Sequence, residues 1–203
     1  RSRTEVWGSV GGAPYTLLEK SFAASDCLYY TVLDANAAFQ NGAADDFVQA
    51  ETLYTQATTD QTLVACSQRE NEVAELQSFS LYRLALIAAY RGQPGVAADL
   101  IGTITSSYPG SAYDQVGQSW LSAYGKGGDI GAACAAVTQF AESTPAAVAV
   151  LGDYGYANPS FSAEEICPVL NIAVPTPTAD EVAAVASATV TATTTTTTTS
   201  APD

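Results

Sequence analysis

Three glutamates in the middle of the chain are the first candidates for chemistry. Glu70, Glu72 and Glu75 lie in one short stretch, and Glu72 and Glu75 would share one face of a helix. Paired carboxylates can carry out acid–base catalysis when the two groups face one another. The alternative interpretation is a solvated helix face, and this is the one that we expect.

A second acidic group surrounds a glycine turn and invites comparison with a calcium loop. Asp34 and Asn36 precede the Asn41-Gly42 turn, and Asp45-Asp46 follows it. The spacing is not that of an EF-hand, and no acidic residue closes the loop at the required distance. We therefore expect no metal ion and no cofactor.

The residues present exclude most known catalytic arrangements. The chain has no histidine, so no Ser-His-Asp or Cys-His arrangement can form. No GxSxG sequence is present, and the Gly125–Gly128 stretch lacks the Ser or Thr that follows the lysine of a P-loop. We therefore expect no catalytic residues and no enzyme.

One aromatic group is a candidate ligand patch. Tyr154, Tyr156 and Phe161 surround Asn158-Pro159, and such a cluster can bind a peptide or a sugar. The alternative is that these rings pack inside a helical protein, as aromatic residues usually do.

Charge excludes two classes of partner. The 203 residues carry a net charge of −14, with only five arginines and two lysines. Binding of nucleic acid or of an anionic membrane surface needs clustered basic residues, and the chain has none. No stretch of apolar residues is long enough to span a bilayer. The chain also begins at Arg1 and has no methionine, so we expect that a signal peptide has been removed.

The four cysteines predict a disulfide framework. An even number in an exported chain favours two disulfides, with three possible connectivities. We favour the two pairs that each lie within one half of the domain, although four free buried thiols remain the alternative. The pairs are Cys27–Cys66 and Cys134–Cys167.

The end of the chain is rich in threonine. Residues 175–203 contain few large apolar side chains, so they cannot offset the entropy of ordering by burying surface. Such tracts are typical of O-glycosylated stalks, which places the protein outside the cell or at its surface. An unmodified tail is the alternative. The candidate acceptors are Thr176, Thr178, Thr189, Thr191, Thr193, Thr194, Thr195, Thr196, Thr197, Thr198, Thr199 and Ser200.

The remaining chain reads as helical. We expect residues 1–12 to form an N-terminal arm and residues 13–174 to form one helical domain that begins at Pro14. Expected breaks are the Asn41-Gly42 turn and a short cap that starts at Ser162. Between them we expect a helix that opens at Asp45-Asp46, one or two helices over 63–90, and another over 146–156.

An internal repeat is the clearest signal in the helical part. Five positions recur with a constant offset of 36 residues, and each unit reads as a helix, a glycine turn and a second helix with small inward-facing residues. The matched pairs are Gly92 and Gly128, Ala97 and Ala133, Ile101 and Val137, Ile104 and Phe140, and Pro109 and Pro145.

This pattern resembles the tetratricopeptide repeat. Leu81, Leu84 and Ala85 match the large-large-small triplet of its first helix, and Ala97 matches the small residue of its second. The Tyr108–Ser111 stretch is similar to a connection seen in exported bacterial members. The second unit departs from the family in its first helix. The resemblance implies an all-α fold, a short α-solenoid of antiparallel helix hairpins, followed by the extended tail.

Two functions fit these features. The first is a structural subunit of an extracellular assembly, such as a fibril, sheath or surface layer. Its partners would be copies of itself, joined through the terminal segments by heterologous contacts, and covalent glycans. The second is an exported tetratricopeptide-like module that binds a protein or peptide on its concave face.

Overall fold

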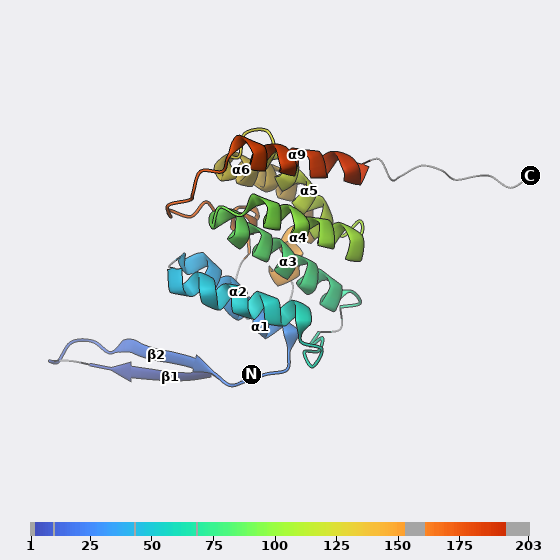
Figure 1. Ribbon diagram of the computed structural model, residues 1–203. Helices are drawn as coiled ribbons and strands as arrows, with labels where there is room; N and C mark the ends of the chain where they lie inside the picture. The colour runs from blue at the N-terminus through green and yellow to red at the C-terminus, as the bar shows by residue number, and fades with distance from the viewer. Residues whose placement is uncertain (1–2, 10, 43, 68, 153–160, 194–203) are drawn as a thin grey trace, which may run out of the picture.

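The computed structural model describes residues 3–9, 11–42, 44–67, 69–152 and 161–193. These residues form nine helices and one two-stranded hairpin, and most helices pack against their neighbours in sequence (Figure 1). The expected all-helical fold is therefore right for the body of the molecule and wrong for its N-terminus.

An antiparallel hairpin occupies the N-terminal region. Strand β1 (Arg3–Gly8) pairs with β2 (Thr16–Phe22), and a bulge interrupts the ladder between Val6 and Trp7. The hairpin projects away from the helical body beside α1 and α2 (Figure 1).

This hairpin corrects two expectations, the arm over 1–12 and a helix from Pro14. Leu17, Leu18 and Phe22 fit a helical spacing, but the chain reverses direction before them. Gly11 and Gly12 have φ values of 63° and 78°, which residues with a Cβ rarely adopt, and this turn lets β2 return along β1.

The first helical pair agrees with the sequence. Helix α1 (Leu28–Asn41) packs along α2 (Ala44–Thr59). Gly42 has a φ of 70° and ends α1 in the left-handed conformation, as the Asn-Gly dipeptide predicts. The long helix α3 (Glu72–Tyr90) starts later than expected, because Val64, in the connection before it, pairs with Cys27 at the start of α1.

The repeat appears as two consecutive helix hairpins. Helix α3 packs with α4 (Pro94–Ser107), and α5 (Ala112–Tyr124) packs with α6 (Ile130–Glu142). Helices α4 and α6 begin 36 residues apart, which is the offset found in the sequence. Gly92 and Gly128, at the two matched turns, have φ values of 71° and 70°.

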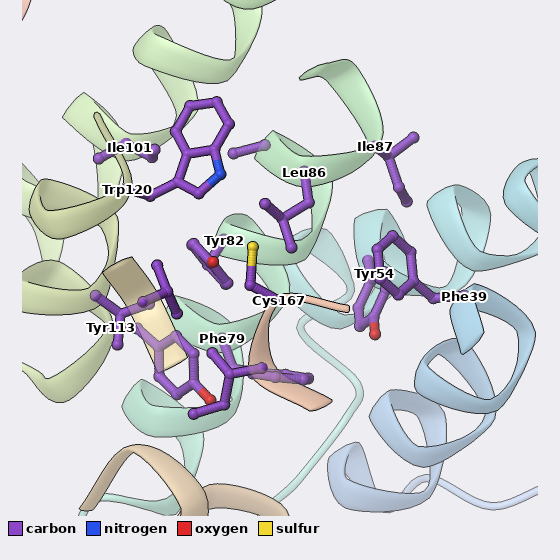
Figure 2. Close-up of a cluster of buried hydrophobic side chains, with 14 of the residues drawn as sticks. Phe39, Tyr54, Phe79, Tyr82, Leu86, Ile87, Ile101, Tyr113, Trp120 and Cys167 are labelled. Carbon is purple, nitrogen blue, oxygen red and sulfur yellow. The ribbon is translucent and has the colours of Figure 1, made fainter. Parts of the chain in front are cut away.

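Small residues bring the repeated helices close together. Ala97 and Ala133, which match across the repeat, are both fully buried. A Cβ at Gly117 of α5 would lie 2.8 Å from a methyl group of Ile101 in α4, so only glycine fits there. Large side chains, including Trp120, fill the core between these helices (Figure 2).

A short helical segment closes the body. Helix α7 (Pro145–Gly152) is followed by α8 (Ala163–Ile166), which begins at the expected capping box of Ser162 and Glu165. The end of the expected 146–156 helix lies outside the described residues. Tyr90 holds the following segment, because its hydroxyl donates to the Pro168 carbonyl and accepts from the Leu170 amide.

The last described element corrects the expected extended tail. Residues 179–193 form helix α9 (Ala179–Thr193), which packs on α4 and α5 and buries Val185. Thr178 caps this helix: its amide and hydroxyl donate to Glu181, and its hydroxyl accepts from the Glu181 amide. Val182 and Ala186 of this helix lie against Gly128 and Gly125, so small apolar side chains form its contact with the body.

Candidate functional site

The three glutamates of the cluster differ in burial and in their partners. Glu72 is buried, and its carboxylate accepts hydrogen bonds from the amides of Cys66 and Ser67 at 3.2 and 2.8 Å and from the Ser67 hydroxyl at 2.7 Å. Glu75 pairs with Arg69, and Glu70 is exposed. The expected solvated face is therefore wrong for Glu72, which is held at the start of α3 as a structural acceptor.

The residues compared with a calcium loop are also separated. Asn36 is buried in α1 and accepts a hydrogen bond of 2.8 Å from Arg83. Asp45 and Asp46 lie in the first turn of α2, and their side chains lie outside the described part of the molecule. Within the described residues, no three Cys, Asp or Glu side chains are grouped so that they would hold a metal ion.

A buried arginine is the feature that the sequence analysis missed. Arg83 is fully buried in α3, and its guanidinium lies 4.7 Å from the ring centre of Phe39 and 5.0 Å from that of Phe79. It also donates to the Glu165 carbonyl, so it ties α1, α3 and the α8 segment together. Its position directly before Leu84, inside an apolar helix, was the available signal.

Three tyrosines surround this arginine in the core. Burial raises the pKa of Tyr54, Tyr82 and Tyr113 above the usual 10.0, and the positive charge of Arg83 acts in the opposite direction. The Tyr113 hydroxyl donates to the Ala147 carbonyl at 2.8 Å. These side chains are packing residues, because each phenol is enclosed by the helical body (Figure 2).

The candidate aromatic patch is only partly described. Tyr154 and Tyr156 lie outside the described residues. Phe161 packs against the core, with its ring centre 5.9 Å from that of Phe79.

The cysteines form two disulfides with the expected connectivity. Cys27–Cys66 joins the start of α1 to the connection before α3, and Cys134–Cys167 joins α6 to the segment after α8. Two such bonds are typical of proteins that fold in an oxidising, extracytoplasmic compartment.

The candidate glycosylation residues lie in several environments. Thr176 is exposed, and Thr178 caps α9. Thr189, Thr191 and Thr193 lie within α9, and residues 194–200 lie outside the described part of the chain.

The hairpin carries the largest exposed apolar side chains. Tyr15, Leu18 and Trp7 are 73%, 63% and 52% exposed, and Val6 and Leu17 are exposed as well. Leu17 lies opposite Trp7 across the hairpin, and Leu18 lies over Gly8, where a Cβ would be 2.3 Å from its nearest methyl carbon. An isolated two-stranded hairpin is marginally stable in water, so this surface is an expected contact site.

A groove of about 400 Å³ lies elsewhere on the helical body. Its walls come from the start of α3, the α4–α5 turn and α7, and its lining is mostly apolar. A hydrogen bond of 2.9 Å from the Tyr108 hydroxyl to Gln77 fixes one wall, and Asp114 accepts from the Gly110 amide at 2.8 Å. Principal lining residues are Ala74, Tyr108, Ala112, Tyr113, Ala146 and Val150.

Comparison with family models, curated proteins and solved structures finds no match to this chain. In the described residues no single helix has the length and apolarity needed to cross a bilayer. Helices α6 and α7 meet that requirement only as a pair, and they are bent by 91° relative to each other.

Proposed function

We propose that this protein is a structural subunit of an extracellular assembly. In this proposal, copies of the chain join through their terminal segments, and the threonine-rich end carries O-linked glycans. The observation that carries the proposal is the hairpin, which projects from the helical body (Figure 1) and has five large apolar side chains exposed.

The ends of the helical stack support this role. The hairpin lies at the end of the body formed by α1 and α2 (Figure 1), whereas α9 packs on α4 and α5. The two ends therefore present different surfaces, and contacts between different surfaces produce rings or open filaments. Two helix hairpins that follow a 36-residue offset also support a short tetratricopeptide-like solenoid as the building block.

The extracellular setting draws on two features. Two disulfides stabilise the domain, and seven consecutive threonines followed by a serine lie near the end of the sequence. Mass spectrometry of peptides from the native protein tests the modification. Hexose-type mass additions on residues 189–200 are expected, and an unmodified tail contradicts this part of the proposal.

Sedimentation and electron microscopy test the assembly itself. The complete chain, purified from its native source, is concentrated stepwise and then imaged. We expect regular polymers that grow with concentration. A chain that remains monomeric throughout contradicts the structural role.

A binding module for a peptide or protein is the second candidate, because the groove between α3, α5 and α7 is apolar and accessible. In this case, a monomeric chain would capture an unrelated apolar peptide, and Ala146→Arg would abolish capture. Assembly of the pure protein into polymers, with no added partner, favours the first function.

A further inference from the structure

The hairpin needs a covering surface that its own helical body does not provide. Trp7 lies opposite Leu17 across the strands, and Leu18 covers Gly8, the next residue after Trp7, so apolar side chains are exposed on both faces of the hairpin near the bulge. These residues remain exposed, whereas the described helices bury one continuous apolar core. A free apolar hairpin of this kind gains stability when a second surface covers it.

We propose that the hairpin of one copy docks in the groove between α3, α5 and α7 of a second copy. This inference rests on the proposed function, and it names the two surfaces through which the subunits would join. The hairpin is the donor surface, and the groove is the acceptor surface.

Charge favours the hairpin, of all parts of a second copy, as the occupant. Residues 1–22 contain three basic and two acidic residues, a formal charge of +1. The remaining residues contain four basic and 19 acidic residues, a formal charge of −15. Most surfaces of this acidic chain repel one another, and the hairpin segment is the part of one copy that the acidic body of another copy does not repel.

The groove suits aromatic and aliphatic side chains. Tyr108 lines the groove together with the small side chains of Ala74, Ala112 and Ala146, which leave space beside its ring. Its volume of about 400 Å³ is large enough for more than one apolar side chain. Glu75 lies at its edge but is paired with Arg69, so an apolar occupant leaves no unpaired carboxylate there.

The positions of the two surfaces favour an open chain of subunits. The tip of the hairpin points to one side of the molecule, and the α4–α5 turn, which lines the groove, lies on the other side (Figure 1). Because the donor and acceptor are different surfaces, each copy would use its hairpin on one neighbour and its groove on the next. Such contacts continue without closing unless the rotation between copies forms a ring.

Two variants of the whole chain test the donor and the acceptor surface separately. Trp7→Ser combined with Leu18→Ser removes the apolar donor, and Ala146→Arg fills the acceptor from an exposed position on α7. The matched controls are Val48→Ser, at an exposed valine of α2, and Ala135→Arg, at an exposed alanine of α6 outside the groove. Circular dichroism verifies that all four proteins keep their helices.

Sedimentation measures the outcome. We expect the donor and acceptor variants each to need roughly tenfold or more protein for assembly, whereas the controls behave like the wild type. An equimolar mixture of the two variants should form a dimer that does not grow, because only one complementary pair of surfaces remains. Assembly of either variant at the wild-type concentration overturns this inference but leaves the structural role intact.

The two tryptophans supply a second measurement. Trp7 is 52% exposed and Trp120 is fully buried, so a blue shift of the emission on assembly reports the covering of Trp7. We expect this shift in the wild type and its absence in Ala146→Arg. Polymers that form without a blue shift overturn the docking of the hairpin, and a wild type that never assembles overturns both proposals.

Discussion

At the residue scale, the buried carboxylate of Glu72 is more important for stability than its neighbours. Three donors from residues 66 and 67 share it, and its removal leaves two backbone amides without their acceptor. We expect Glu72→Ala to lower the free energy of unfolding by about 3 kcal/mol in urea titrations. Glu75→Ala is the control, with an expected loss of about 1 kcal/mol or less, because the Glu75–Arg69 pair is partly exposed. Equal losses of unfolding free energy in the two variants would contradict the larger role of Glu72.

The buried tyrosines predict the pH dependence of stability. The pKa of Tyr54, Tyr82 and Tyr113 is raised in the folded state, so the folded protein keeps protons that the unfolded chain releases above its ordinary pKa of 10.0. The contribution of these tyrosines to the free energy of unfolding is therefore fully present below about pH 10. Above that pH it falls by about 1.4 kcal/mol per pH unit for each of these groups.

Urea unfolding from about pH 7 to about pH 11 measures this effect. The chain has no histidine, so we expect little change up to about pH 9, followed by a steep loss. The Tyr54→Phe variant should show a shallower decline. Phenolate absorption that appears in the folded protein, before unfolding, would contradict the prediction.

At the element scale, the repeat turns hold the C-terminal segment. A Cβ on Gly92 would lie 2.8 Å from the Pro175 ring, and a Cβ on Gly128 would lie 2.8 Å from Val182. Both glycines also have positive φ. We expect Gly92→Ala to lower the free energy of unfolding by about 1–2 kcal/mol and to increase hydrogen exchange in α9.

Gly102→Ala is the matched control. Gly102 lies in an exposed position within α4, and a Cβ there meets nothing within 4 Å. This substitution should stabilise the protein by about 1 kcal/mol, because alanine favours helix more than glycine does. A similar effect of the two substitutions would show that the contact with Pro175 is unimportant.

Some of these elements were predictable from the sequence and others were not. The repeat was predictable because its turns need glycine and its helices need small residues at matched positions, such as Ala97 and Ala133. Helix α9 was missed because it has no apolar side chain larger than valine to mark a buried face, although its alanines favour helix and the Thr178-to-Glu181 capping spacing was visible. The hairpin was missed because Leu17 and Phe22 fit both a helix and a bulged strand. The acceptor groove could not be predicted from the sequence, because it forms only when α3, α5 and α7 are brought together.

At the scale of the whole molecule, net charge opposes the proposed assembly. Two copies that each carry −14 repel one another, and the +1 hairpin segment offsets only a small part of this repulsion. Added salt screens both effects, with a Debye length of about 8 Å at physiological ionic strength. Screening does not weaken the apolar contact between hairpin and groove. Because the repulsion between copies is larger than the attraction of the hairpin, its screening decides how assembly changes with salt.

We therefore expect assembly to strengthen as salt is raised from about 0.01 to about 0.15 M, as measured by the concentration at which polymers sediment. The control is Lys20→Glu, which makes the hairpin segment acidic. It should assemble more weakly at low salt and approach the wild type as the salt concentration rises, because screening removes the added repulsion. If salt instead dissolves wild-type polymers, ion pairs dominate the contact between subunits, and the hairpin with its apolar side chains cannot be the main source of its stability.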